Sequence, residues 1–209
     1  MRGGGDHRSE EEGREEGRRR GPRRDPTLLP RRLAADANIL VNTARLAAQR
    51  HLATYAEPVP VEQLVRSLCD AKQGYTQFGG LRPYGVSLLY AGWDCERGFS
   101  LYQSDPSGNY SGWKAAAVGA NAGAALNILR SDYDESVDLA AATRLAVRVL
   151  SKTMDSTALD PQKVELATVT RTEGGTAFRI WDEAELKPLL EEVNAAQKKE
   201  KDKEDAKAK

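Results

Sequence analysis

The sequence is poor in the residues that most often carry catalysis or covalent cross-links. It has 209 residues but only two cysteines and two histidines, and aromatic residues make up 6% of it. The cysteines Cys69 and Cys95 are too few for a disulfide framework or a zinc site, and they fit a reducing compartment best. We therefore expect neither a bound metal nor a cofactor.

Long apolar runs are lacking as well. No stretch approaches the roughly 20 apolar residues of a membrane-spanning helix, so no membrane partner is expected. The 31 basic residues balance the 31 acidic ones, but residues 1–33 hold ten Arg, no Lys and seven acids. The part most suited to folding is acidic and has no basic stripe interleaved with aromatics, so no nucleic-acid partner is expected.

Composition divides the chain into three parts. Residues 1–33 form an Arg/Glu/Gly-rich arm and residues 197–209 a tail of mixed charge. Both have too few apolar side chains to offset the entropy of ordering a chain, so we expect both to be disordered. Residues 34–196 form the folded domain. A nucleic-acid-binding or nuclear adaptor role for the arm is the alternative function, although the acids among its arginines weaken it.

Two helices are expected first. Asp36 and Asn38 offer N-cap oxygens for a helix that runs to about residue 55. The second helix begins at Pro60 and carries one apolar stripe made of Val61, Leu64, Val65, Leu68 and Cys69. Gly74 and the Gly79-Gly80 pair should end this helix.

Strands and further helices follow. Residues 85–94, 99–103 and 111–118 predict three strands, and a later hairpin covers residues 164–171 and 177–181. Between them lie a short helix at 121–129 and a longer one from about Ser136, and a capping box opens the last helix. The stripe of the longer helix is Leu139, Ala142, Leu145, Ala146, Val149, Leu150 and Thr153. The capping box is Asp182 with Glu185, and the last helix turns Leu186, Leu189, Leu190 and Val193 to the core. Paired helices around antiparallel hairpins indicate a layered α+β domain.

No reactive centre emerges from the residues. His51 has no metal-binding partner at ligand spacing, Cys69 lies in an apolar stripe, and Cys95 lies in a turn. We interpret His51 and Cys69 as packing residues and Cys95 as a free surface thiol. The carboxylates of three turn residues are expected to cap backbone N–H groups rather than to act as acids or bases. These residues are Asp94, Asp105 and Asp160.

Four blocks of the sequence resemble the alpha-type subunits of the eukaryotic 20S proteasome. They read DANILVNTAR, YTQFGGLRPYGVSLLYAGWD, SDPSGNYSGWKAAAVGANAGAA and VLSKTMDST, and the resemblance runs from about Asp36 to about Val193. It implies a four-layer αββα sandwich of the N-terminal-nucleophile hydrolase type. The family's first helix and first strands, which would precede Asp36, are expected to be missing, with the arm in their place.

The resemblance also implies a function. Alpha subunits have no peptidase activity, form a seven-membered ring above the beta ring, gate substrate entry and dock regulatory particles during ubiquitin-dependent protein catabolism in cytoplasm and nucleus. Their beta relatives use an N-terminal threonine activated by its own amine. Thr27 lies in the arm, so an active peptidase is the disfavoured alternative and no catalytic residue is expected. Phe78 matches the position that supports the gate, with a plain packing role left open.

Overall fold

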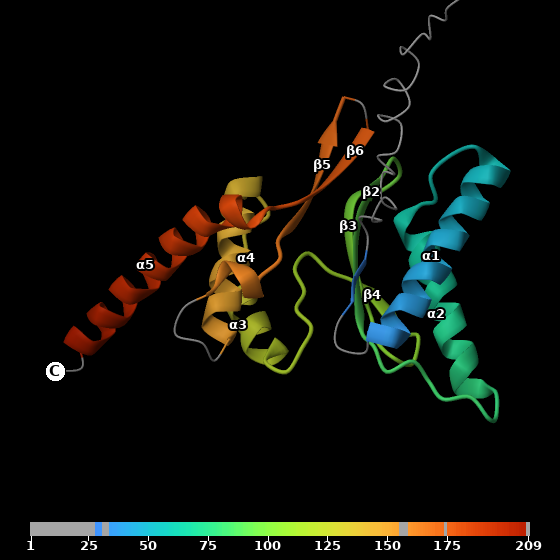
Figure 1. Cartoon of the computed structure of the whole chain (residues 1–209), viewed down its shortest axis with the longest axis horizontal. Helices are drawn as coiled ribbons and strands as arrows, with labels where there is room; N and C mark the ends of the chain where they lie inside the picture. Colours follow the sequence, from blue (N-terminus) through green and yellow to red (C-terminus); the bar gives the residue numbers. More distant parts are fainter. Residues whose placement is uncertain (1–27, 31–33, 155–158, 174, 208–209) are drawn as a thin grey trace, which may run out of the picture.

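The structure is a computed structural model that describes residues 28–30, 34–154, 159–173 and 175–207. Figure 1 shows α1 and α2 on one side, the strands in the middle, and α3, α4 and α5 on the other side. The elements in chain order are β1 (Leu28–Pro30), α1 (Ala34–Tyr55), α2 (Val61–Gln77), β2 (Leu88–Asp94), β3 (Gly98–Ser104), β4 (Tyr110–Gly112), α3 (Ala122–Asp132), α4 (Leu139–Thr153), η1 (Pro161–Lys163), β5 (Ala167–Thr172), β6 (Gly175–Ile180) and α5 (Glu183–Lys207). This arrangement confirms the predicted α+β class.

The strands form two antiparallel sheets. The larger has the order β1-β2-β3-β4, and β2 pairs with β3 along its whole length, from Leu88 opposite Ser104 to Asp94 opposite Gly98. The smaller is the β5–β6 hairpin, which lies against β2. The guanidinium of Arg171 on β5 lies 3.9 Å from the ring centroid of Trp93 on β2, a cation–π contact that ties the hairpin to the larger sheet.

One face of the larger sheet is covered by α1 and α2. Because side chains alternate along a strand, Leu88 and Tyr90 of β2 and Tyr102 of β3 point to the same face, and all three are buried there. The predicted stripe of α2 packs on them and is fully buried, which confirms that prediction. We call this cluster the first core; it contains Ala37, Leu40, Ala44, Val61, Leu64, Val65, Leu68, Cys69, Tyr84, Val86, Leu88, Tyr90 and Tyr102.

A second core lies between α4 and α5 and shares no residue with the first. It contains Val147, Leu159, Val164, Leu186, Leu190 and Val193, so three of the four core residues predicted for the last helix are buried in it. Leu189 packs against it at the margin. At the start of α5, the Glu185 carboxylate accepts the N–H of Asp182 at 3.4 Å, which is half of the predicted capping box.

The predicted stripe of α4 is largely wrong. Val149 of that stripe is buried, but Leu139, Ala146 and Leu150 are exposed, and the other buried residues of the helix are Thr143, Val147 and Ser151. The Thr143 hydroxyl donates to the Leu139 carbonyl oxygen at 2.6 Å. A hydroxyl bonded to its own helix can be buried without an unpaired polar group, and hydropathy alone does not reveal this.

Three other boundaries differ from expectation. Helix α2 continues through Gly74, because hydrogen bonds on either side of a glycine can outweigh its propensity cost of about 1 kcal/mol. Strand β4 ends at Gly112, well short of residue 118, since the alanines that follow have poor strand propensity. Helix α5 extends to Lys207 through the expected disordered tail, whose Lys, Glu and Ala residues are good helix formers.

Most of the N-terminal arm lies outside the described residues, so the disorder expected for residues 1–27 and the place of Thr27 stay predictions. Within the arm, Leu28–Pro30 forms β1 and pairs antiparallel with Leu88–Tyr90. This segment therefore adds a strand to the edge of β2 rather than belonging to a disordered arm. Among the described helices, none combines the length and the apolar character that crossing a bilayer needs.

Asp36 has a different role from the predicted N-cap. Helix α1 begins at Ala34, so Asp36 lies in its first turn, where only 4% of the residue is exposed. Its two carboxylate oxygens accept from the Arg82 guanidinium at 2.8 and 2.9 Å and from the Gly85 N–H at 3.0 Å. These bonds hold the pKa of Asp36 at about 2 and fasten α1 to the segment that leads into β2.

This carboxylate gives a testable pH dependence. The pKa of Asp36 is lower in the folded chain, about 2, than in an unfolded one, so its stabilisation is complete above about pH 4 and is lost as the pH falls through about 2. We expect Asp36→Asn to lower the urea midpoint at pH 7, and the difference from the wild type to shrink between pH 4 and pH 2. The control is Asp70→Asn, because Asp70 is exposed on α2, and it should leave the urea midpoint unchanged at pH 7 and at low pH. A difference between wild type and Asp36→Asn that is the same at all pH values would contradict this role.

Candidate functional site

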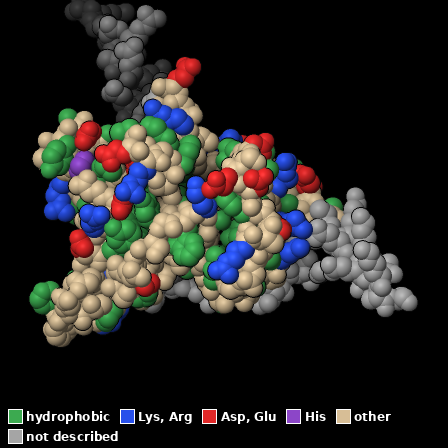
Figure 2. Space-filling view, turned by 180° about the vertical axis from the view of Figure 1, so that it is seen from behind, with side chains coloured by type: hydrophobic (Ala, Val, Ile, Leu, Met, Phe, Trp, Pro, Cys, Tyr) green, Lys and Arg blue, Asp and Glu red, His purple; other side chains and the backbone are tan. Residues whose placement is uncertain are grey.

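Helix α1 carries apolar side chains on two sides. Its inner side contributes Ala37, Leu40 and Ala44 to the first core, while Ile39 and Leu46 are exposed, Leu46 by 64%. Figure 2 shows hydrophobic side chains lying among charged ones at the surface of both halves of the molecule. Exposed large apolar side chains that lie on one side of a helix mark a surface for a protein partner, so the outer side of α1 is suited to such a contact.

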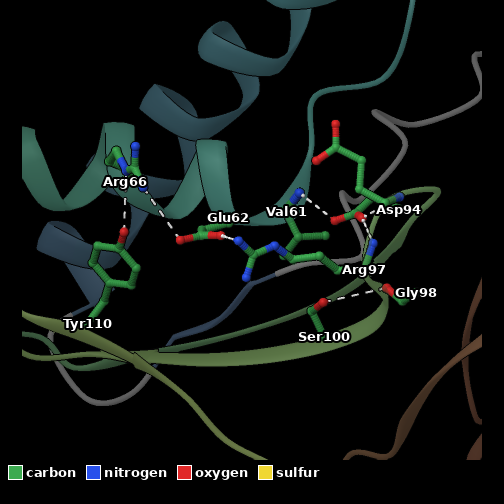
Figure 3. A network of polar contacts seen from close by, with 9 residues as sticks. Val61, Glu62, Arg66, Asp94, Arg97, Gly98, Ser100 and Tyr110 are labelled. Atoms are coloured by element: carbon green, nitrogen blue, oxygen red, sulfur yellow. Dashed lines mark hydrogen bonds and ion pairs between the residues drawn. The ribbon is translucent and has the colours of Figure 1, made fainter.

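Helix α2 is bound to the larger sheet by a chain of charged groups along its surface, shown in Figure 3. Glu62 accepts from Arg97 of the β2–β3 turn at 2.6 Å and from Arg66, one helical turn away, at 3.5 Å. Arg66 Nε also donates to the hydroxyl of Tyr110 on β4 at 3.3 Å. These contacts therefore join the exposed side of α2 both to the β2–β3 turn and to β4.

The Asp94 carboxylate fixes the N-terminus of α2. Its Oδ2 accepts the N–H of Val61 at 3.2 Å, and its Oδ1 accepts the N–H groups of Glu96 and Arg97 at 3.1 and 2.7 Å (Figure 3). One side chain thus stabilises the β2–β3 turn and satisfies an orphan donor of the helix. The prediction that Asp94 caps backbone groups is confirmed.

The two other turn aspartates also behave as predicted. Asp105 Oδ1 accepts from the N–H and the hydroxyl of Ser107 at 2.9 and 2.6 Å and from the N–H of Asn109 at 3.2 Å. These bonds lower the pKa of Asp105, and the largest cause is the hydrogen bond from the hydroxyl of Ser107. Asp160 Oδ1 accepts the N–H of Gln162 at the start of η1 at 3.1 Å. All three carboxylates therefore serve turns and helix starts.

Sequence analysis missed the most unusual residue of the structure, Lys72. It lies on the core side of α2, its exposure is 0%, and its ammonium donates to Ser104 Oγ at 2.8 Å. Tyr90 shares a hydrogen bond of 2.9 Å with the same Ser104 oxygen. Lys72 stands three residues after Cys69 in the apolar stripe, and that spacing was the available signal.

Neither thiol forms a reactive centre in the described part of the chain. Cys69 is buried, and burial raises its pKa against the opposing effects of Lys72 and Ser104, so its thiolate is disfavoured. The His51 ring packs on Tyr55 of the same helix, 4.6 Å between centroids, and no described hydrogen bond joins it to Cys69. Cys95 is exposed, as predicted. The described residues contain no group of three or more His, Cys, Asp or Glu that could hold a metal ion.

Phe78 lies at the C-terminus of α2, where its N–H donates to the Gly74 carbonyl at 3.3 Å. Its residue exposure is 67%, so a packing role inside this chain does not apply. Tyr75, one turn earlier, is also exposed. The gate-supporting role of Phe78 stays a prediction.

A cavity of about 650 Å³ lies between the C-terminal half of α1, the start of α2 and the β5–β6 hairpin. Its walls are mainly apolar and include Leu52, Val59 and Trp93. Two of its charged groups are engaged elsewhere, Asp94 by backbone N–H groups and Arg171 by the Trp93 ring. The cavity therefore offers apolar surface rather than an assembled set of reacting groups.

Known proteins similar to this chain agree on one family. A family model described as "Proteasome subunit" matches residues 33–169. "Proteasome subunit alpha type-4-1" of Oryza sativa subsp. indica is 66% identical over 137 residues, which are 66% of this chain and 55% of the rice protein. "Proteasome subunit alpha type-4-A" of Arabidopsis thaliana is 59% identical over 159 residues, 76% of this chain and 64% of that protein. "Proteasome subunit alpha type-4" of Spinacia oleracea is 56% identical over 166 residues, 79% and 66% respectively. The chain thus spans little more than half the length of the rice relative.

Proposed function

The chain belongs to the proteasome subunit family, and we propose that it is a non-catalytic alpha-type subunit of the 20S core particle. In this role it takes part in building the alpha ring, in gating substrate entry and in docking regulatory particles during ubiquitin-dependent protein catabolism. Its partners are other alpha subunits beside it, the beta ring beneath it and regulatory particles at its outer face. The high identity to alpha type-4 subunits from three plants supports this proposal.

The observation that carries the proposal is the surface formed by α1 and α2. These helices lie within the matched region, cover one face of the larger sheet, and leave Ile39 and Leu46 exposed on the outer side of α1. A subunit that works through assembly needs such a surface, because interfaces between permanent partners are rich in apolar side chains. The raised pKa of the buried Cys69 also supports a non-catalytic subunit. We further propose a location in cytoplasm and nucleus, which the two free cysteines support.

The test is co-expression of the full chain with the other alpha subunits, followed by size separation and detection of this chain in the ring fraction. We expect it to co-migrate with the ring. We also expect no covalent adduct with threonine-directed inhibitors. A chain that stays outside the ring contradicts the assembly role, and an adduct contradicts the non-catalytic role.

A charge placed on the outer side of α1 should weaken this assembly. We expect Leu46→Glu to lower the amount of chain in the ring fraction about tenfold, because an unpaired carboxylate at an apolar interface costs more than the 1.4 kcal/mol of a tenfold change. The matched control is Leu150→Glu, since Leu150 is an exposed leucine on α4. Both variants should unfold at the wild-type temperature. An equal loss of incorporation by both would show that the outer side of α1 has no special part.

A further inference from the structure

We propose that Lys72 is a positioning residue whose buried ammonium holds the 105–109 turn against α2 and so presets a docking surface. The exposed residues of the turn are Pro106, Ser107 and Asn109, with the exposed Gln73 of α2 beside them, so the surface is mainly polar and has one apolar group. It suits a protein neighbour that offers an apolar group to Pro106 and hydrogen-bonding groups to Ser107, Asn109 and Gln73. The docking part of this inference rests on the proposed function, in which that neighbour is another subunit of the ring.

The first support is that every proton of the ammonium has a partner. Lys72 Nζ lies 2.8 Å from Ser104 Oγ, 3.1 Å from the Val86 carbonyl oxygen and 3.2 Å from the Asp105 carbonyl oxygen. An ammonium has three donors and no acceptor, so all of its hydrogen-bonding capacity is used. The three acceptors lie before β2, at the end of β3 and at the start of the turn. One side chain therefore joins α2 to two backbone carbonyl groups and one side-chain hydroxyl around the sheet.

The second support is the way the turn and the ammonium share Asp105. The Asp105 carbonyl oxygen accepts from Lys72 and also from the N–H of Gly108 at 3.2 Å, which closes the turn. The carboxylate of the same residue is engaged with Ser107 and Asn109 inside the turn. Burial lowers the pKa of Lys72, so a charged form depends on these fixed oxygens. The lysine and the turn therefore stabilise each other's geometry.

The third support is independent of Lys72. Gly108 has a φ of +89°, and a Cβ at this residue would lie 2.5 Å from the Cys69 carbonyl oxygen and 2.9 Å from the Gln73 nitrogen. The turn thus lies directly on the backbone of the α2 segment from which Lys72 projects. A turn held on both sides has already lost the conformational freedom that binding would otherwise cost. Its exposed tip is therefore ready to bind without rearrangement.

Hydrogen exchange of the full chain tests the positioning role. In Lys72→Met we expect the amides of Gly108 and Asn109 to exchange at least tenfold faster, while the amides of the β2–β3 ladder change by less than threefold. The matched control Lys163→Met removes an exposed lysine from η1 and should change neither group. If exchange of the turn amides and of the ladder amides is accelerated equally, Lys72 only fills the core. If exchange of the turn amides is not accelerated, the turn is held without Lys72. Either result overturns the proposal.

A milder variant keeps the test decisive if Lys72→Met does not fold. Ser104→Ala removes one of the three acceptors and keeps the ammonium. We expect the same turn amides to exchange about threefold faster, again with little change in the ladder. Turn amides that stay at the wild-type rate in Ser104→Ala would count against the network.

Incorporation into the ring tests the docking role separately. We expect Lys72→Met to enter the ring fraction at one tenth of the wild-type level or less, and Lys163→Met to enter it like the wild type. A turn that loosens while incorporation stays complete overturns the docking role and leaves the positioning role standing. A wild-type chain that does not enter the ring contradicts the proposed function instead, and the exchange experiment still decides what Lys72 does.

Discussion

Replacing Leu68 by alanine is expected to lower the free energy of unfolding of the first core by about 2–5 kcal/mol. Leu68 is fully buried on α2 among the side chains of the first core. Its truncation removes apolar area from contact with protein and leaves a cavity, and both effects destabilise the folded state. Hydrogen exchange of the β2 and β3 amides, measured along a urea titration, reports the free energy of unfolding that this core has lost.

The control for Leu68→Ala is Leu46→Ala on α1. Leu46 is exposed in the free chain, so its truncation should change the same free energy by no more than about 0.5 kcal/mol. The second core shares no residue with the first, so exchange from α5 should be much less affected. Similar losses for the two leucines would mean that α2 does not pack on the sheet as described.

Replacing Gly108 by alanine is expected to cost about 3 kcal/mol or more, because two penalties add at this position. The left-handed φ of +89° is unfavourable for any residue with a Cβ, and that Cβ would meet the backbone of α2 at 2.5 Å. A backbone carbonyl inside a helix cannot move aside as the end of a flexible side chain can. The turn must therefore lift from α2, which thermal unfolding and exchange of the Asn109 amide would both report.

Gly80 separates the two penalties. Its φ of +84° is nearly the same, but nothing lies within 4 Å of the place where a Cβ would stand. Gly80→Ala should therefore cost only the conformational penalty, about 1–2 kcal/mol. The difference between the free-energy costs of Gly108→Ala and Gly80→Ala measures the penalty that comes from the close approach of the turn to α2. Equal costs would show that the turn does not lie on α2.

Features that depend on local chemistry could be predicted from the sequence. The turn aspartates, the stripe of α2 and the core residues of α5 follow from spacing and residue type, and the structure bears them out. Lys72 could not be placed in this way. A lysine is almost never fully buried, and the oxygens that bind Lys72 come from three segments that meet only in the folded chain.

The errors have two causes, which are partners distant in the sequence and polar side chains that bond to their own helix. Asp36 looked like a helix cap because its partner, Arg82, is 46 residues away. The buried side of α4 was misplaced because Thr143 satisfies its hydroxyl within the helix and can be buried despite being polar. The exposed apolar side of α1 could be recognised only once the burial of each of its side chains was known from the structure. Periodicity predicted where most helices and strands lie, but which of their sides pack depends on the folded chain.

The separation of the two cores has a consequence for synthesis on the ribosome. The first core is drawn from residues 37–102 and the second from residues 147–193, each a continuous stretch of chain. The earlier stretch can therefore collapse as soon as it has emerged, before the later one has been translated, because domains generally fold as units from the N-terminal side. Until the β5–β6 hairpin arrives, the side of β2 that carries Trp93 is without the Arg171 contact. That interval is when we expect a chaperone to bind the nascent chain.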